Sequence, residues 1–187
     1  MSGGATRRWH YRRVVVMERM LTGDLPLPPA RLPVRVAPLA TDELSSLALL
    51  RPELTNDTFR QRLARGHRCF AAWHEGRIVH AGWAAPRAAW IEFLDYALPL
   101  AEGEVYQYDS YTAPAARGMG VAALRVAWMA RHYQGEGAKR LIAVVWPGSP
   151  GAFRPLEKAG YRRRGSIHVL RLGPWRRVLH TRSRSRQ

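Results

Sequence analysis

Cysteine is scarce in this sequence, and long apolar runs are missing. Cys69 is the only cysteine among 187 residues, which excludes an internal disulfide. We expect a buried structural thiol rather than a nucleophile, because free cysteine is among the most buried residue types. No uncharged apolar run approaches the roughly 18–20 residues that cross a bilayer, so no membrane span is predicted. A single thiol is compatible with a reducing compartment, and we expect a cytoplasmic location.

Lysine is also rare, although the chain is strongly basic. Lys139 and Lys158 are the only lysines, so arginine carries nearly all of the formal net charge of +16. Either GC-rich codon usage or an anionic partner, such as nucleic acid, an acidic protein, a membrane surface or an anionic cosubstrate such as CoA, would account for this excess. Much of it lies in the cluster 162–164 and near the C-terminus, at Arg176, Arg177, Arg182, Arg184 and Arg186. The Arg-Ser alternation at the end of the chain predicts a disordered tail.

Two common catalytic signatures are missing as well. The seven histidines are scattered and form no His-x-x-x-His pair, so no metal site is predicted. No serine lies in a Gly-x-Ser-x-Gly elbow, so a hydrolase triad has no support.

The hydrophobic pattern predicts an α/β fold. Helices are expected from Thr41, as the N-cap, and over 57–65 and 120–133, the last with Arg125 and Arg131 off its apolar face. A short helix is expected before Gly160, beginning near Arg154 with Pro155 in its first turn. Strands are expected over 11–21, 34–36, 68–73, 77–84, 90–94, 105–112, 141–146 and 161–172. The continuous apolar run 141–146 is typical of a strand that is buried on both faces.

The most informative segment is the loop between the expected strand 105–112 and the expected helix 120–133. It contains Gly118 and Gly120 just after Arg117. Glycine lets the backbone approach a ligand closely, and a helix N-terminus favours an anion. The loop lacks the third glycine of a dinucleotide fingerprint and the Lys-Ser/Thr of a P-loop. The glycine spacing alone would equally suit a simple strand-to-helix turn.

Two segments together resemble a known family. Residues 117–122 fit the pattern Arg/Gln-x-x-Gly-x-Gly/Ala, which resembles the acyl-CoA pyrophosphate loop of the GNAT superfamily of N-acyltransferases. Residues 156–161, Leu-Glu-Lys-Ala-Gly-Tyr, resemble that family's second signature, usually Tyr-Glu-Lys-Leu-Gly-Phe. The resemblance covers roughly residues 34–172. It implies a mixed, mostly antiparallel central sheet with helices on both faces. It also implies a parallel strand pair that splays apart around residues 108–112 and 142–146.

The resemblance also implies a cosubstrate site. Acetyl-CoA or another acyl-CoA would bind with its pyrophosphate on the loop and its carbonyl at backbone N–H groups of the preceding strand. The residues implied are Ser110, Tyr111 and Thr112 in the strand and Arg117, Gly118, Met119, Gly120, Val121, Ala122 and Ala123 in the loop and helix.

The sequence departs from the family pattern where proton transfer is expected. The family's common acidic tyrosine would fall at Leu156, and the asparagine often found seven residues earlier falls at Ser149. Val144 and Val145 stand where some members carry a glutamate base. Asp109 is the carboxylate predicted to act as the base, unless it only caps a turn or pairs with an arginine. The alternatives are Glu92, Asp95 and Glu104 for the base and Tyr108 or Tyr111 for the acid.

These observations divide the chain into three expected parts. Residues 1–33 form an N-terminal strand extension with a proline-rich connector, residues 34–173 form the GNAT-like domain, and residues 174–187 form the basic tail. The expected function is transfer of an acyl group from acyl-CoA to an unidentified amine. The alternatives are a non-catalytic acyl-CoA-binding or regulatory module and a nucleic-acid-binding protein.

Overall fold

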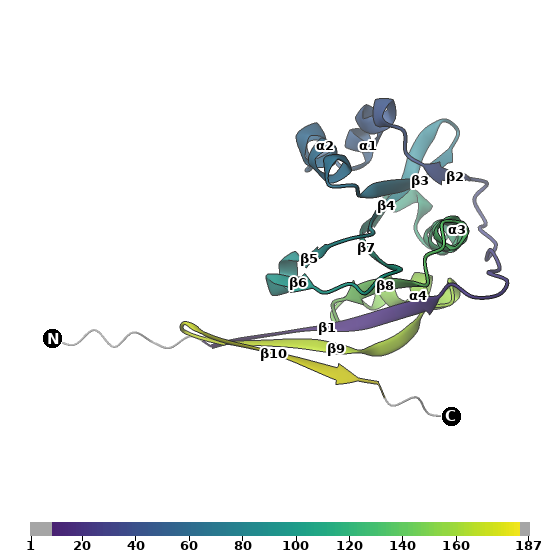
Figure 1. Cartoon of the computed structure of the whole chain (residues 1–187). Helices are drawn as coiled ribbons and strands as arrows, with labels where there is room; N and C mark the ends of the chain where they lie inside the picture. Colours follow the sequence, from purple (N-terminus) through teal and green to yellow (C-terminus); the bar gives the residue numbers. More distant parts are fainter. Residues whose placement is uncertain (1–8, 184–187) are drawn as a thin grey trace.

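The computed structural model describes residues 9–183 and consists mainly of one eight-stranded sheet (Figure 1). The strand order is β10-β9-β1-β8-β7-β4-β3-β2. The strands are β1 (Trp9–Met20), β2 (Arg35–Pro38), β3 (Arg68–His74), β4 (Arg77–Ala85), β7 (Glu104–Thr112), β8 (Arg140–Val145), β9 (Arg162–Leu172) and β10 (Trp175–Arg182). Within residues 9–183, only β7 and β8 pair in parallel, so the predicted mixed, mostly antiparallel sheet is confirmed.

Helices cover both faces of this sheet. The α-helices are α1 (Leu44–Leu50), α2 (Asn56–Ala64), α3 (Val121–Gly135) and α4 (Pro150–Lys158). On one face, α3 and α4 bury apolar side chains against β1, β3, β7 and β8. On the other face, α1 and α2 pack on β3 and β4, and the small sheet of β5 (Ala89–Ile91) and β6 (Tyr96–Leu98) covers the other end. No helix in residues 9–183 is long and apolar enough to cross a membrane.

The early strand β1 is a central member of the sheet rather than an extension of it. It lies between β8 and β9, with Val15 opposite Val145 in one register and Ser166 in the other. Val14 to Met17 are buried, so both faces of the strand contribute to the core. A local pattern predicts that residues 11–21 form a strand, but it does not reveal which strands lie beside it.

The prediction of a disordered tail is wrong for residues 175–182. These residues form β10, which pairs antiparallel with β9, and Val178 lies opposite Val169. A turn at Gly173, with φ of +57°, lets the chain reverse after Leu172. Residues 184–187, with Arg184 and Arg186, lie outside the described part of the chain.

Three further local predictions need correction. Residues 41–43 form a 3₁₀ turn, η1 (Thr41–Glu43), and Ala40 rather than Thr41 precedes it. The strand expected over 90–94 ends at Ile91 and is followed by a second 3₁₀ turn, η2 (Glu92–Leu94). Strands β6 and β10 were not predicted from the sequence, because β6 is short and β10 is strongly basic.

Candidate active site

A bulge in β7 sets the directions of the predicted site residues. His80 and Ala81 of β4 pair with Thr112 and Tyr111, but Trp83 pairs with Tyr108. Asp109 and Ser110 therefore lie opposite the single residue Gly82, so β7 has one extra residue here. Asp109 has a φ of +48°, which is uncommon for a residue with a side chain. As a result, Asp109 points to the α1–α2 face of the sheet, where it bonds arginines of that layer. Ser110 points to the opposite face, where it contacts α3.

Strands β7 and β8 separate just before this bulge. Their parallel register runs from Glu104↔Arg140 to Gln107↔Ala143, and beyond it Val144 and Val145 pair only with β1, on the other side of β8. A cleft of about 300 Å³ opens between the separated strand ends. It is lined by Gln107, Tyr108, Asp109, Ser110, Thr112, Ala122, Val126, Ala143, Val144, Val145, Trp146, Ser149, Gly151, Ala152, Pro155 and Leu156. The predicted splayed parallel pair is therefore present.

A larger cleft of about 740 Å³ continues from the first one over the glycine loop. All the predicted cosubstrate residues except Met119 line it: Ser110, Tyr111, Thr112, Arg117, Gly118, Gly120, Val121, Ala122 and Ala123. Gly120 precedes α3 with a φ of +84°, and no side chain caps the helix. The first N–H groups of a helix have no intrahelical partner, so this end of α3 suits an anionic group.

Helix α4 forms the other wall of the larger cleft and supplies positive charge. Arg154 and Lys158 line the cleft together with Arg117, so three cationic side chains surround the glycine loop. The sequence indicated α4 through the second signature but did not identify Arg154 or Lys158 as site residues. Their positions along α4, four residues apart, place them on one side of a helix.

The proline-rich connector supports the loop from behind. The backbone N–H of Arg31 donates to the Met119 carbonyl at 2.8 Å, and its guanidinium donates to the Gly118 carbonyl at 2.8 Å. A Cβ atom at Gly120 would lie 2.9 Å from the carbonyl oxygen of Pro29, so the connector leaves room for glycine alone there. Met119 helps to hold the loop, and its side chain is partly exposed outside the cleft.

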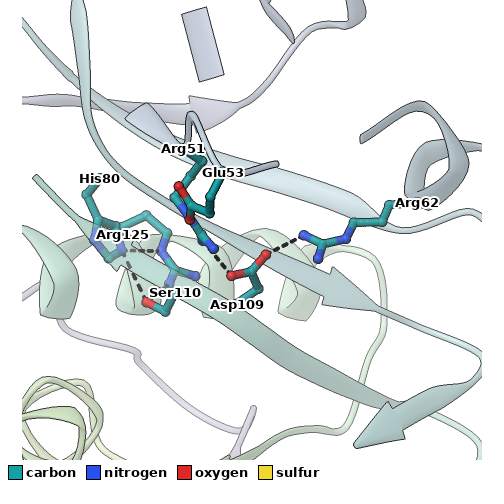
Figure 2. A network of polar contacts seen from close by, with 7 residues as sticks. All are labelled: Arg51, Glu53, Arg62, His80, Asp109, Ser110 and Arg125. Carbon is teal, nitrogen blue, oxygen red and sulfur yellow. Dashed lines mark hydrogen bonds and ion pairs between the residues drawn. The ribbon is translucent and has the colours of Figure 1, made fainter. Parts of the chain in front are cut away.

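Asp109 forms a double ion pair on the α1–α2 face (Figure 2). Arg51, at the end of α1, donates to Asp109 Oδ1 at 2.5 Å, and Arg62 of α2 donates to Oδ2. Burial raises the pKa of Asp109, but the hydrogen bonds from Arg51 and Arg62 outweigh it and bring the pKa below its usual value. Both carboxylate oxygens are therefore occupied, and the group has little tendency to accept a proton. The role of Asp109 as the base stays a prediction that this environment disfavours.

The alternative carboxylates are placed differently. Glu104 is buried at the far end of β7, where it pairs with Arg140 and Arg164, and Asp95 pairs with Arg171. Neither lines the clefts. Glu92 is exposed in η2 and lines neither cleft, so none of the three alternatives is placed at the site.

The two tyrosines considered as the acid, Tyr108 and Tyr111, have different surroundings. Tyr108 lines the smaller cleft, but its hydroxyl is 2.6 Å from Nδ1 of His67, which does not line that cleft. Burial raises the pKa of the Tyr108 hydroxyl. Tyr111 lies under the guanidinium of Arg51, which is 5.0 Å from the ring centroid. Leu156 is buried on the wall of the smaller cleft, so an apolar side chain occupies the place where the family pattern expects a tyrosine.

Pro155 does not begin α4, as the sequence suggested, but lies inside the helix, which starts at Pro150. Proline is tolerated best in the first turn of a helix, and Pro155 is the sixth residue of α4. The predicted start near Arg154 is therefore wrong. The helix begins earlier, and this brings Gly151 and Ala152 to the clefts.

A buried cation, Arg125, lies beside the bulge on the α3 face of the sheet (Figure 2). Arg125 of α3 has no exposed surface, and its guanidinium contacts His80, Ser110 and Met129. A Cβ atom at Gly82 would lie 2.4 Å from an Arg125 nitrogen, so only glycine leaves space for it there. The sequence placed Arg125 away from the apolar face of the helix and gave no signal of this arrangement.

The fold and the two clefts can be compared with known proteins. A model of the acetyltransferase (GNAT) family matches residues 37–161. Similar solved structures include a GNAT-family protein from Novosphingobium aromaticivorans, with 15% identity, a TM-score of 0.59 and coverage of 98% of this chain and 71% of that chain. A GCN5-related N-acetyltransferase from Sphaerobacter thermophilus has 16% identity and a TM-score of 0.64, with coverage of 92% of this chain and 52% of that chain.

An aminoglycoside N-acetyltransferase in complex with CoA has 17% identity and a TM-score of 0.55, with coverage of 80% of this chain and 99% of that chain. No curated protein sequence matches significantly. At these identities the structural likeness shows the fold, and the chain spans only about half the length of the Sphaerobacter protein. The family model, in contrast, covers most of the chain, from β2 to the residue before β9. The chain therefore belongs to the acetyltransferase (GNAT) family, whose members transfer an acetyl group from acetyl-CoA to an amine.

Proposed function

We propose that this protein transfers an acetyl group from acetyl-CoA to an amine in the smaller cleft, between β7 and β8. The observation that carries the proposal is the continuity of the two clefts. The larger cleft offers the N-terminus of α3 and three cations, which suit the phosphates of CoA. The smaller cleft leads from there to the ends of β7 and β8, which no longer pair with each other.

The role of β7 follows from its broken pairing. From Tyr108 onward, β7 pairs with β4 on one side and is separated from β8 on the other. Backbone groups along such an edge can pair with an extended ligand as another strand would. Ser110, Tyr111 and Thr112 lie on this edge, so their backbone N–H groups are the proposed partners of the thioester carbonyl. Preorganised donors of this kind stabilise the charge that develops during acyl transfer.

The acceptor amine is not identified by these residues. A small amine, a protein N-terminus or lysine, and an aminoacyl group all stay within the proposal. A cytoplasmic location also stays a prediction, and the buried Cys69 thiol is compatible with it. Arg51 and Arg62 pair with Asp109, and Arg51 also pairs with Glu53, so two cations and two carboxylates balance in this cluster (Figure 2).

One observation favours a second candidate, a non-catalytic acyl-CoA-binding or regulatory module. Leu156 cannot protonate a leaving thiolate, and Asp109 is held by two arginines. A thiol-release assay over a panel of amines and peptides separates the two candidates. The proposed function predicts acceptor-dependent release of CoA, whereas binding of acetyl-CoA without release by any acceptor would favour the binding module.

A further inference from the structure

Arg125 has an unusual electrostatic environment. Its guanidinium is fully buried, and no carboxylate of residues 9–183 lies within ion-pair distance of it. The other titratable groups that face it are His80 of β4, Cys69 of β3 and Tyr161, just before β9. Burial raises the pKa of the Cys69 thiol to about 12 and also raises the pKa of Tyr161, so both are neutral at pH 7.

The guanidinium itself keeps its charge. Burial lowers the pKa of Arg125 to about 10, which still leaves it protonated at neutral pH. Burial also lowers the pKa of His80 well below its usual value, with the charge of Arg125 acting in the same direction. Arg125 is therefore a buried cation surrounded by neutral groups. A buried charge without a counter-ion costs several kcal/mol. An anion bound close to Arg125 would offset this cost.

The hydrogen bonds of Arg125 lead toward the clefts. Arginine can only donate, so Arg125 Nε donates to His80 Nε2 at 3.1 Å, and NH2 donates to Ser110 Oγ at 2.9 Å. Since His80 Nε2 accepts, the proton of the neutral ring is on Nδ1, which donates to Thr112 Oγ1 at 2.8 Å. The oxygens of Ser110 and Thr112 thus each receive one hydrogen bond from this network.

The hydroxyl protons of Ser110 and Thr112 remain to be placed. His80 Nε2 is 3.5 Å from Ser110 Oγ, but it already accepts the shorter bond from Arg125. Both side chains line the junction of the two clefts. An acceptor that enters this junction therefore meets two hydroxyl donors backed by a buried positive charge.

We propose that Ser110 and Thr112, polarised by Arg125, form a site for the thiolate that leaves acetyl-CoA, in place of the tyrosine that Leu156 replaces. In the reaction the amine nitrogen bonds to the acyl carbon, the carbon–sulfur bond breaks, and its electron pair stays on sulfur. The two hydroxyls donate hydrogen bonds to the sulfur, and the proton lost by nitrogen passes to solvent. Arg125 is a positioning residue, because it acts through Ser110 and, by way of His80, through Thr112. This inference rests on the proposed function, since it requires CoA in the clefts.

The test is a pH titration of the thiol of CoA bound to the full chain. The ultraviolet absorbance of the thiolate monitors the titration. CoA is the probe, desulfo-CoA provides the blank, and no acceptor is needed. We expect the pKa of the bound thiol to be at least about one unit below that of free CoA, a tenfold preference for thiolate. The shift is expected to disappear in Arg125→Met and in Ser110→Ala combined with Thr112→Val.

Two further variants separate charge from packing. Met129→Leu removes a neighbour of Arg125 but keeps the charge and the volume, so the thiol pKa should stay low. Arg125→Lys should restore part of the shift that Arg125→Met loses. If Arg125→Met does not fold, the Ser110→Ala and Thr112→Val protein decides the question, since Ser110 is exposed on the cleft wall.

The outcomes distinguish this inference from the proposed function. Bound CoA with the pKa of free CoA, or an equally low pKa in all variants, would overturn the thiolate site and leave acetyl-CoA binding intact. Failure of CoA to bind in calorimetry would overturn the thiolate site together with the proposed function.

Discussion

At the scale of single residues, Asp109 connects three parts of the fold. Its two oxygens join the bulge of β7 to Arg51 at the end of α1 and to Arg62 in α2. All three side chains are largely buried, so these bonds are poorly screened by water. We therefore propose that Asp109 holds the α1–α2 layer on the sheet beside the site.

This tether predicts a loss of stability on substitution. Asp109→Asn should lower the free energy of unfolding by about 2–3 kcal/mol at pH 7, because it leaves two arginines without their counter-ion. Urea denaturation measures this loss. Asp57→Asn is the matched control, since Asp57 pairs with Arg60 at an exposed site and should change stability by less than about 0.5 kcal/mol. Equal stability of the two variants would contradict the tether.

The pH dependence follows from the lowered pKa of Asp109. A carboxylate whose pKa is lower in the folded state stabilises the fold above its unfolded pKa of about 3.9, and this contribution is lost as the pH falls toward the folded pKa. The stability gap between wild type and Asp109→Asn should therefore be constant from about pH 5 to pH 7 and shrink below about pH 4. A gap that widens in acid would rule out the ion pair as its source.

The cations of the larger cleft carry a second prediction at this scale. Lys158→Glu should weaken acetyl-CoA binding by about tenfold or more, because a charge-assisted hydrogen bond to phosphate contributes about 1.5–3 kcal/mol. Lys139→Glu makes the same charge change at the other lysine, which lies outside the cleft, and should have little effect. Calorimetry compares the two. Gly120→Glu is a poorer test, because a side chain there would also collide with Pro29.

At the scale of helices and strands, the sequence predicted the features that depend on local pattern and missed those that depend on long-range pairing. The strand, glycine loop and helix from residue 105 to 133 were predictable, since each depends on neighbours in sequence. The ion pairs of Asp109 and the contacts of Arg125 were not, because they join residues 15 to 58 positions apart. The central place of β1 depends on pairing with strands more than 120 residues away.

The central position of β1 predicts that a substitution at a buried residue of this strand strongly lowers the stability of the protein. Met17 is fully buried between α3 and the sheet, so Met17→Ala should destabilise the protein by about 2–5 kcal/mol. Met20→Ala is the control, because Met20 is half exposed at the end of the same strand. Thermal or urea denaturation measures both. A small effect at Met17 would mean that β1 contributes little to the sheet.

At the scale of the whole molecule, the net charge of +16 is spread over both ends of the chain and the site. Arg176, Arg177 and Arg182 lie on β10, an edge strand with exposed side chains, rather than on a disordered tail. An anionic partner for this surface stays a prediction. Figure 1 shows β9 and β10 projecting beyond the helical layers, away from α3.

This surface predicts binding to polyanions that depends on salt. RNA or DNA should bind weakly at low salt, and the affinity should fall steeply as salt rises, because bound counterions are released from phosphates. Replacing Arg176 and Arg177 with glutamine should reduce the slope of log K against log salt by about two. A slope unchanged by these substitutions would place any such binding elsewhere on the molecule.

The central claim is that the two clefts form one acetyl-CoA site. Calorimetric titration of the full chain with acetyl-CoA, and then with CoA, tests it most directly, since it requires no knowledge of the acceptor. We expect saturable binding of both ligands at one site per chain, weakened by Lys158→Glu and not by Lys139→Glu. Folded wild-type protein that binds neither ligand would show that the clefts are not an acetyl-CoA site.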